Sequence, residues 1–204
     1  MSRKVVIIGA GGHAKVIADI VSSRGDKVVG FLDDDTSKLG KKIYKDLEVL
    51  GTTQDFTKYG DCEFVIAVGD NHAREQIAKT MSVKWYTAIH PGAVVADTVK
   101  VGAGTVVMAG AVINSDSVVG QHCIINTGAT IDHDNVLADF VHVSPGAHLA
   151  GIVKVGKYTW ICIGATVINN ISIIDDVILG AGAVATKDLS EPGVYVGVPA
   201  RRVK

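Results

Sequence analysis

The sequence predicts two structural parts: an α/β part at the N-terminus and an all-β parallel β-helix that makes up the rest of the chain. Strands alternate with helices over residues 1–86, whereas from residue 87 onward aliphatic residues return at every sixth position. The composition agrees, since 23 glycines and an aromatic content of only 5% favour β-structure with tight corners. We therefore expect one domain over residues 1–86 and a second domain over residues 87–204.

The first domain has the pattern of a small parallel α/β sheet. Residues 5–9 form a buried strand, and residues 13–22 form an amphipathic helix after a glycine turn. Residues 27–32 form a second strand that ends in three aspartates. A third strand over residues 64–69 precedes a helix over residues 71–81. Such alternation is typical of parallel strands that are joined by helices.

The glycine turn, residues 9–14 (Gly-Ala-Gly-Gly-His-Ala), matches the G-x-G-x-x-G/A pattern of nucleotide-binding proteins. Its glycines let the backbone approach a pyrophosphate, and the helix N-terminus offers free N–H donors. Asp33 follows the second strand, where an acid can bond a ribose. A tight turn without a ligand and a nicotinamide dehydrogenase are the alternatives. A dehydrogenase needs two such halves, so this single Rossmann-like half favours a nucleotide-linked substrate.

The second domain consists of sixteen consecutive hexads without an insertion. An aliphatic residue begins each one: Ile89, Val95, Val101, Val107, Ile113, Val119, Ile125, Ile131, Leu137, Val143, Leu149, Val155, Ile161, Val167, Ile173 and Leu179. A helix cannot keep this pattern on one face, because six residues fall about 120° short of whole turns. Three six-residue sides instead form a triangular coil of eighteen residues, with the aliphatic and the small fifth residues inside. At about 1.5–3 kcal/mol per buried aliphatic side chain, this core can hold a narrow prism.

Charge and composition exclude several classes of protein. Twenty Lys and Arg against 21 Asp and Glu give a formal net charge of −1, without the basic cluster of a nucleic-acid-binding protein. The 48% hydrophobic content excludes global disorder. Cys62, Cys123 and Cys162 form no CxxC pair, which argues against disulfides and zinc thiolates. With no signal peptide and no apolar run of about 18 residues, we expect a soluble cytoplasmic protein without a membrane span.

Two histidines of the repeat are candidates for chemistry. His133 is third in its hexad, at or near a corner, between Asp132 and Asp134. These acids can hold its tautomer and raise its basicity, as a general base requires, although an exposed histidine in a polar corner is the alternative. His142 is sixth in its hexad and should point outward. Its neighbours at intervals of eighteen residues form an apolar stripe, which predicts a subunit interface where a long thioester cofactor is gripped: Val106, Ile124, Trp160 and Ile178.

Seven short motifs occur in order along nearly the whole chain: residues 11–14 (Gly-Gly-His-Ala), 31–34 (Phe-Leu-Asp-Asp), 68–71 (Val-Gly-Asp-Asn), 125–128 (Ile-Asn-Thr-Gly), 131–134 (Ile-Asp-His-Asp), 141–144 (Val-His-Val-Ser) and 196–200 (Val-Gly-Val-Pro-Ala). Together they resemble the sugar O-acyltransferase family, which contains sialic-acid O-acetyltransferases and UDP-4-amino-sugar N-acetyltransferases of the bacillosamine pathway. The resemblance implies a left-handed β-helix of hexapeptide repeats. It also implies acetyl-CoA as co-substrate and a homotrimer with active sites between adjacent prisms.

The resemblance also implies roles for individual residues. The catalytic histidine matches His133 and its polarising acid matches Asp134, with Asp132 as the alternative contact. Asn126 matches an asparagine near the substrate amine. Four residues match acetyl-CoA positions: His142, Gly151, Ile163 and Ala181. Seven match the nucleotide-sugar pocket: Gly11, Gly12, His13, Asp33, Asp34, Gly69 and Asn71.

Direct acetyl transfer follows from these roles. His133 takes the proton of the attacking group, and the backbone N–H of Gly151 stabilises the oxyanion; no cysteine occupies a position for an acyl-enzyme. We expect no metal, because hexapeptide-repeat zinc enzymes use histidines five residues apart, whereas the gaps from His122 through His133 and His142 to His148 are eleven, nine and six. The cations of Lys187 and residues 198–204 either meet CoA phosphates or form a solvated basic end.

Three functions are compatible with this sequence. The first is N-acetylation of a UDP-4-amino-4,6-dideoxy sugar in bacterial glycan biosynthesis, which the nucleotide-type turn favours. The second is O-acetylation of sialic acid or another sugar hydroxyl. The third is a trimeric solenoid that binds sugar nucleotides without catalysis, against which the presence of both His133 and Asp134 argues.

Overall fold

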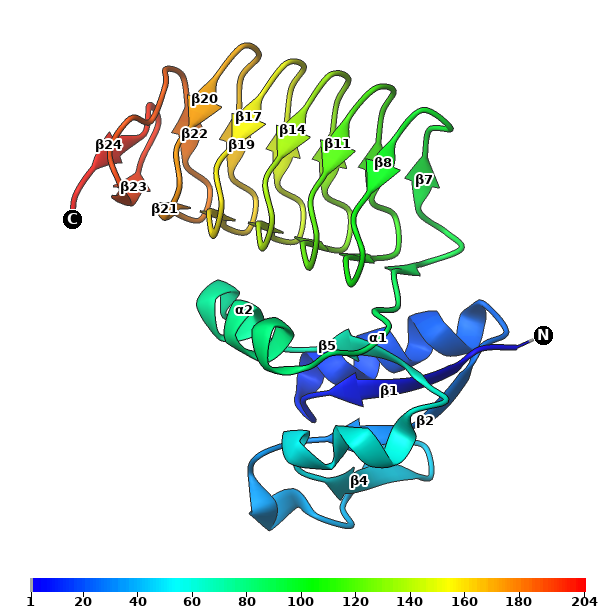
Figure 1. The fold of residues 1–204 in the computed structure, drawn as a ribbon. Helices are drawn as coiled ribbons and strands as arrows, with labels where there is room; N and C mark the ends of the chain where they lie inside the picture. The colour runs from blue at the N-terminus through cyan, green and yellow to red at the C-terminus, as the bar shows by residue number, and fades with distance from the viewer. Residues whose placement is uncertain (1) are drawn as a thin grey trace. The chain divides into compact units, whose positions relative to one another are not determined.

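The computed structural model describes residues 2–204 (Figure 1). The chain forms two compact units, of which the first ends at Pro91 and the second spans Gly92–Lys204. The predicted first domain ends slightly earlier, at residue 86. Among the residues described, no helix is both long and apolar enough to cross a membrane.

The first unit is built on a five-stranded sheet of order β3-β4-β2-β1-β5. Its strands are β1 (Lys4–Ile8), β2 (Lys27–Leu32), β3 (Lys42–Tyr44), β4 (Leu47–Gly51) and β5 (Glu63–Ile66). All neighbouring pairs are parallel except β3 and β4. Its helices are α1 (Gly12–Ser23) and α2 (Asn71–Thr80), with 3₁₀ helices η1 (Thr36–Lys38) and η2 (Thr53–Tyr59). The sequence prediction contained β1, β2, β5 and both α-helices but missed the β3–β4 hairpin and the 3₁₀ helices.

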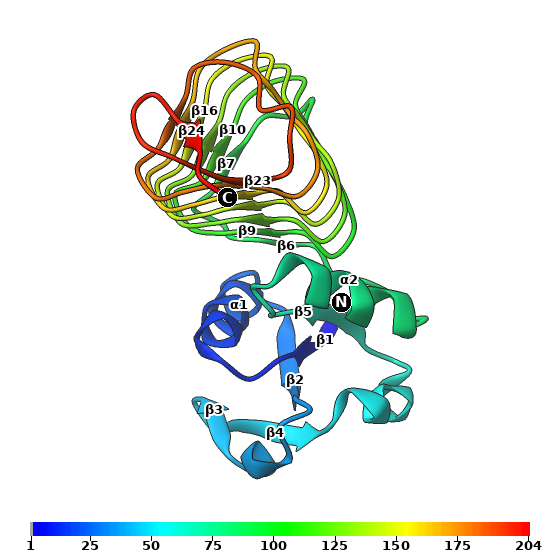
Figure 2. The ribbon, with the colours of Figure 1, turned by 90° about the vertical axis from the view of Figure 1, so that its left-hand side faces the viewer.

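Helices cover both faces of this sheet, which explains why its central strands are uninterrupted apolar runs. Val6 and Ile8 of β1 belong to a core cluster with side chains of η2 and α2, including Phe56 and Ile77. The alternate residues Val5 and Ile7 are also fully buried, as are the inward residues of α1. Figure 2 shows α1 on one side of the sheet, with α2 and η2 on the other.

The second unit forms a prism of three sheets, in which every neighbouring pair of strands is parallel except β23 and β24, and the first strand of face 1, β6, precedes Gly92 in the chain. Face 1 contains β6 (Ala88–Ile89), β9 (Val106–Val107), β12 (Ile124–Ile125), β15 (His142–Val143), β18 (Trp160–Ile161), β21 (Val177–Leu179), β23 (Gly193–Val196) and β24 (Arg201–Arg202). Face 2 contains β7 (Val94–Val95), β10 (Val112–Ile113), β13 (Thr130–Ile131), β16 (His148–Leu149), β19 (Thr166–Val167) and β22 (Val184–Ala185). Face 3 contains β8 (Lys100–Val101), β11 (Val118–Val119), β14 (Val136–Leu137), β17 (Lys154–Val155) and β20 (Ser172–Ile173).

The register confirms a coil of eighteen residues. Ile113 pairs with Ile131, and Ile131 pairs with Leu149. Of the sixteen aliphatic residues that begin hexads, the thirteen from Val107 to Leu179 are buried, and the three at the N-terminal end are partly exposed. The predicted aliphatic stack is therefore the core of the prism.

Each corner of the prism turns through the left-handed backbone region. The fourth residue of every hexad from Val101 to Leu179 has a positive φ, between 52° and 73°. In the corner between faces 1 and 2 (corner 1–2), this residue is always glycine: Gly110, Gly128, Gly146, Gly164 and Gly182. In the corner between faces 2 and 3 (corner 2–3), it is a residue with a side chain: Asp116, Asp134, Ile152 and Asn170. The corner between faces 3 and 1 also has side chains at this position in four coils: His122, Phe140, Tyr158 and Asp176.

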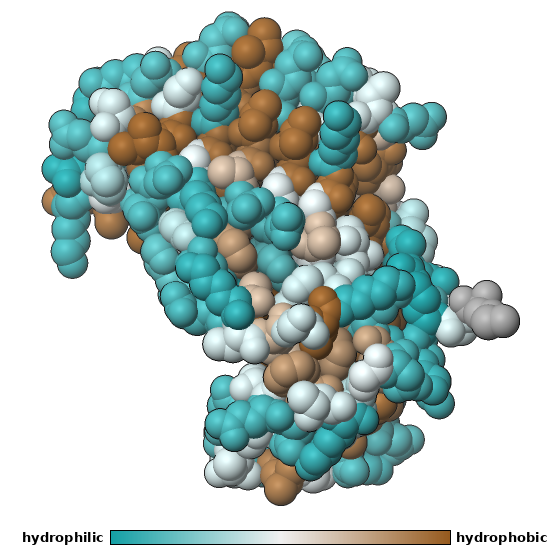
Figure 3. Space-filling model, viewed as in Figure 1, coloured by the Kyte–Doolittle hydropathy of each residue, from teal (hydrophilic) through white to brown (hydrophobic). Residues whose placement is uncertain are grey.

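The chain folds back at its C-terminal end. β24 pairs antiparallel with β23 and covers the last edge of face 1. Arg202 donates to the carbonyl of Pro192 at 3.0 Å and lies 3.4 Å from Glu191. Part of the basic tail thus binds the prism itself. Figure 3 shows apolar surface between the polar side chains of this unit.

Candidate active site

His133 and Asp134 form a hydrogen-bonded pair at corner 2–3, between β13 and β14. The left-handed turn at Asp134, with φ of 58°, brings its carboxylate back to the preceding ring. Asp134 Oδ2 lies 2.7 Å from His133 Nδ1. This hydrogen bond raises the pKa of His133, and the charge of Asp132 contributes in the same direction. Because both side chains are about half exposed, the second ring nitrogen is accessible as a base.

Asp132 has a different role in this corner. Its Oδ1 accepts the backbone N–H of His133 at 2.9 Å and the side-chain amide of Asn114 at 2.8 Å. The hydrogen bond from Asn114 lowers the pKa of Asp132. Asp134 therefore contacts the imidazole, while Asp132 fixes the backbone that carries it.

Gly151 lies beneath the imidazole, one coil further along. A Cβ atom at Gly151 would be 2.6 Å from both Cε1 and Nε2 of His133. The ring can occupy this position only because residue 151 has no side chain. The N–H of Gly151 makes no hydrogen bond to any residue within 2–204.

A second group of predicted residues lies at corner 1–2 and on the adjoining face 1. The amide of Asn126 lies 3.3 Å from Nε2 of His142. The His142 ring stacks on Trp160 with centroids 5.7 Å apart, and Trp160 donates to the hydroxyl of Ser144. Ile163 is 59% exposed, and Ala181 is also exposed. This group combines apolar surface with two polar side chains that contact each other.

The apolar stripe of face 1 is present but unevenly exposed. Val106, Ile124, His142, Trp160 and Ile178 follow one another in register. Val106, Ile124 and His142 are buried, whereas Trp160 exposes 42% of its surface. The exposed part of the stripe therefore centres on Trp160.

The predicted catalytic and cofactor residues are divided between two corners of the prism. His133, Asp134 and Gly151 occupy corner 2–3, whereas Asn126 and Ile163 occupy corner 1–2. With six residues per side at about 3.3 Å per residue, two corners of one coil lie up to about 20 Å apart. One prism by itself does not bring these two groups into one site.

The seven predicted nucleotide-pocket residues follow the carboxyl ends of β1, β2 and β5, which are neighbours in the sheet. These residues are Gly11, Gly12 and His13 after β1, Asp33 and Asp34 after β2, and Gly69 and Asn71 after β5. The structure thus gathers them at the edge where α/β sheets bind ligands. Gly11 and Gly12 have open space where a side chain would stand, so a ligand can approach their backbone.

Asp33 holds the glycine turn in place. Its carboxylate accepts the N–H groups of Ala10 at 2.7 Å and Asp35 at 2.9 Å. Lys38 Nζ lies 2.9 Å from the same carboxylate. Although burial opposes ionisation, the bonds from Lys38, Asp35 and Ala10 lower the pKa of Asp33. Asp33 therefore supports the turn directly, and a cavity of about 240 Å³ lies beside it.

His13 and Arg74 lie close to each other at this edge. The Nε2 atom of His13 is buried and has no hydrogen-bond partner among residues 2–204. Burial, together with the charge of Arg74, lowers the pKa of His13 to about 4. Arg74 is 1% exposed and donates to the carbonyls of Val68 and Gly69 and to the side chain of Asn71. The ring is consequently neutral near pH 7.

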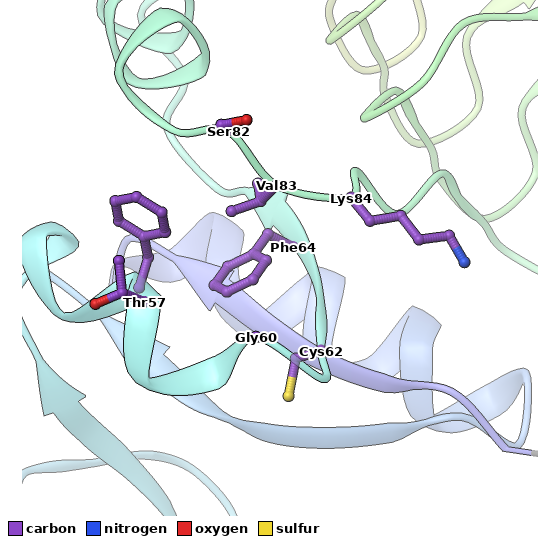
Figure 4. Close-up of a pocket in the computed structure, with 8 residues that line it drawn as sticks. Thr57, Gly60, Cys62, Phe64, Ser82, Val83 and Lys84 are labelled. Carbon is purple, nitrogen blue, oxygen red and sulfur yellow. The ribbon is translucent and has the colours of Figure 1, made fainter.

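A separate cavity of about 400 Å³ lies at the opposite end of β5 (Figure 4). It is lined by side chains that include Phe56, Phe64 and Val83, and Figure 4 shows Lys84 extending away from Phe64 and Val83. Lys84 bonds Glu63 at 2.7 Å. No predicted site residue lines this cavity. Within residues 2–204, no three or more His, Cys, Asp or Glu side chains are grouped to hold a metal ion.

Sequence reasoning missed three side chains that support these sites. Lys38 and Arg74 are cations on helical segments, which normally face solvent. Asn114 could have been found, because it stands eighteen residues before Asp132 and the repeat therefore stacks the two. For Lys38 and Arg74 the sequence offers no comparable signal.

Hexapeptide coils with an acid-paired corner histidine define the class of hexapeptide-repeat acyltransferases, and comparisons with known proteins identify the family. Residues 4–81 match the family model described as the PglD N-terminal domain. A structure of PerB from Caulobacter crescentus in complex with CoA and GDP-perosamine is 37% identical, covers 98% of this chain and 97% of that chain, and has a TM-score of 0.92. The acetyltransferase domain of PglB from Neisseria gonorrhoeae in complex with acetyl coenzyme A is 36% identical, covers 100% of both chains and has a TM-score of 0.92.

The chain belongs to the sugar O-acyltransferase family, as the sequence motifs indicate. Its second unit is a left-handed parallel β-helix, which confirms the predicted fold class. Among curated proteins, UDP-N-acetylbacillosamine N-acetyltransferase from Bacillus subtilis is 40% identical over 100 residues, which are 46% of this chain and 46% of that protein. An uncharacterized protein of Acanthamoeba polyphaga mimivirus is 37% identical over 97 residues, 47% of this chain and 19% of its own length. The chain thus spans less than half the length of these two curated relatives.

Replacing Gly151 with alanine should displace the imidazole of His133, because the new Cβ would overlap the ring. We expect kcat for CoA release from acetyl-CoA to fall by about 100-fold, the effect of a misplacement of about 1 Å. Ser115→Ala, at the equivalent corner position two coils before Gly151, is the matched control and should keep its activity. A Gly151→Ala enzyme with the wild-type kcat would show that the ring does not need this position.

The neutral His13 should make the first unit sensitive to acid. Because the folded pKa of about 4 lies below the ordinary value of 6.5, its stabilising contribution is complete above pH 6.5 and is lost as the pH falls toward 4. The difference corresponds to about 3 kcal/mol of unfolding free energy. Urea unfolding, followed by circular dichroism of α1 and α2, should show this loss in the wild type and a much smaller one in His13→Gln. Equal losses in the two proteins would contradict the buried, neutral ring.

Proposed function

We propose that this protein transfers the acetyl group of acetyl-CoA to the amine of a UDP-4-amino-4,6-dideoxy sugar. The observation that carries the proposal is the His133–Asp134 pair, on a hexapeptide prism that shares its chain with a nucleotide-type turn. Acetylation of a nucleotide amino sugar is supported by a relative that matches nearly the whole chain, a perosamine N-acetyltransferase in complex with CoA and GDP-perosamine. The choice of a UDP-sugar is supported by the curated relative named UDP-N-acetylbacillosamine N-acetyltransferase.

In this mechanism His133 is the general base. As the sugar nitrogen attacks the thioester carbonyl, its proton passes to Nε2 of His133, while Asp134 holds the opposite nitrogen and stabilises the charged ring. The new C–N bond forms a tetrahedral oxyanion, which the N–H of Gly151 stabilises. The C–S bond then breaks, and the proton on His133 passes to the leaving sulfur of CoA.

Direct transfer without an acyl-enzyme fits the state of the cysteines. Cys62 and Cys123 are buried, and Cys162 is partly buried. Burial raises the pKa of both Cys62 and Cys162, so neither is a thiolate at neutral pH. A thioester needs no further activation of its acyl carbon when a neutral amine is held against it.

The complete active site is proposed to form between copies of the chain, as a homotrimer. Corner 2–3 of one copy would supply His133, Asp134 and Gly151, and corner 1–2 of the next would supply Asn126 together with the acetyl-CoA residues His142, Ile163 and Ala181. Both corners carry exposed apolar side chains, with Ile152 47% and Ile163 59% exposed. Exposed apolar surface of this kind is a mark of protein interfaces.

The acceptor is tested by measuring release of free CoA. The purified protein should turn over acetyl-CoA with a UDP-4-amino-4,6-dideoxy sugar and show no turnover with sialic acid. His133→Ala should lower kcat by about 10²–10⁴-fold. Turnover with sialic acid and not with the amino sugar would contradict the proposed N-acetylation and support O-acetylation instead. Binding of the nucleotide sugar without release of CoA would indicate a non-catalytic solenoid.

The location of the site is tested by mixing two inactive variants, His133→Ala and His142→Ala. If the two histidines of one site come from different copies, co-expression should restore activity at about a quarter of the interfaces in randomly mixed trimers. Each variant expressed alone is the control. A mixed assembly with no recovered activity would mean that both histidines act from the same chain.

A further inference from the structure

Polar side chains occur at a few fifth positions of the hexads, which otherwise bury small or branched apolar residues. They share one hydrogen bond, to the carbonyl fifteen residues further along: Thr105 to Gly120 at 2.8 Å, Ser117 to Asp132 at 2.7 Å, Thr159 to Ile174 at 2.9 Å and Asn135 to Ala150 at 3.0 Å. Each of these side chains thus ties one coil to the next inside the prism.

Asn135 makes additional bonds that the hydroxyl residues do not make. Its side chain is fully buried, and its amide nitrogen also donates to the carbonyls of Asp132 at 2.6 Å and His133 at 3.3 Å. Its side-chain oxygen accepts the N–H of Val153 at 3.0 Å, as the hydroxyls of Thr105 and Ser117 accept the N–H eighteen residues further along, so only the bonds to Asp132 and His133 set Asn135 apart. Inside the prism, the amide of Asn135 therefore binds the carbonyls of both Asp132 and His133, whereas the hydroxyl of Ser117 binds that of Asp132 alone.

The bonds converge on the peptide groups on both sides of His133. The carbonyl of Asp132 accepts both Asn135 and the hydroxyl of Ser117. The carbonyl of His133 accepts Asn135 and the N–H of Ile152 at 3.0 Å. From outside the prism, the side chain of Asp132 accepts the N–H of His133. The residue that bears the base thus has both of its backbone polar groups occupied.

A buried amide is costly in an apolar core unless all its groups are bonded. Asn135 meets this requirement because the carbonyls of Asp132 and His133 in the preceding turn point into the prism. A serine or threonine has a single hydroxyl hydrogen, so it can keep the bond to Ala150 but not the bonds to the corner as well. A hydroxyl at this position would therefore be enough to join the two coils, and the further bonds of the amide stabilise the backbone of the corner.

We propose that Asn135 is a positioning residue for the His133–Asp134 pair, acting through the backbone of residues 132–133. By fixing that backbone, it keeps the imidazole over Gly151 and Nδ1 within reach of Asp134. The role rests on the proposed function of His133 as base, but the arrangement of the pair can be measured without any substrate.

The test is the titration of His133 in Asn135→Ser. The ring signal is followed by NMR and assigned by its absence in His133→Asn. Because contact with Asp134 raises the pKa of His133, loosening the corner should lower that pKa toward its ordinary value. In the acetyl-transfer assay, the acidic limb of the kcat profile should move to lower pH. The plateau kcat should fall by about 10–100-fold, with KM for both substrates unchanged.

Thr105→Val is the matched control, because it removes a buried fifth-position hydrogen bond at another corner. It should lower the melting temperature without changing the titration of His133. If Asn135→Ser does not fold, Asn135→Thr keeps the residue type already present at positions 105 and 159 and is titrated instead.

An unchanged titration of His133 in the folded Asn135 variant would overturn the positioning role, and so would an equal shift in Thr105→Val. These outcomes are independent of the proposed function. If no nucleotide amino sugar is acetylated by the wild-type protein, the proposed function fails while the titration still decides the role of Asn135.

Discussion

The prism depends on one backbone constraint: the chain must enter the left-handed region once in every six residues. That turn closes each corner and lets the first and fifth residues of a hexad point inward. Because three such sides make eighteen residues, any residue lies against the ones eighteen before and after it. His133 over Gly151 and Asn114 beside Asp132 are both consequences of this spacing. The surroundings of the candidate base are therefore fixed by the same repeat that builds the core.

The two corners use the left-handed turn differently. Corner 1–2 has glycine at all five of its turns, which is the residue with no steric cost there. Corner 2–3 instead has Asp134 in the turn, and the strained position brings its carboxylate to the ring of His133. A glycine at residue 134 would relieve the strain but remove the acid. At this coil the residue in the turn therefore also orients an imidazole.

The first unit relies on polar groups that fix its turns. Asp33 binds the N–H of Ala10, and Arg74 binds the carbonyls that follow β5. His13 adds no charge here near neutral pH, and the open space at Gly11 and Gly12 leaves the backbone at the N-terminus of α1 accessible. In the sequence, Asp33 and Arg74 look like ordinary charged surface residues, because the backbone groups that they bind are brought to them only by the fold.

The sequence alone determined the sixteen-hexad core, the alternation of strands and helices, and the motifs around His133, because period and residue type are local properties. It could not choose between Asp132 and Asp134, since that choice depends on the φ of one corner residue. Nor could it find Arg74 or the role of Asn135, whose partners become neighbours only when coils or strands are packed. The tertiary structure likewise decided that the candidate site is divided between two corners. Asn126 and His133 are close in the sequence, but one side of the prism lies between them.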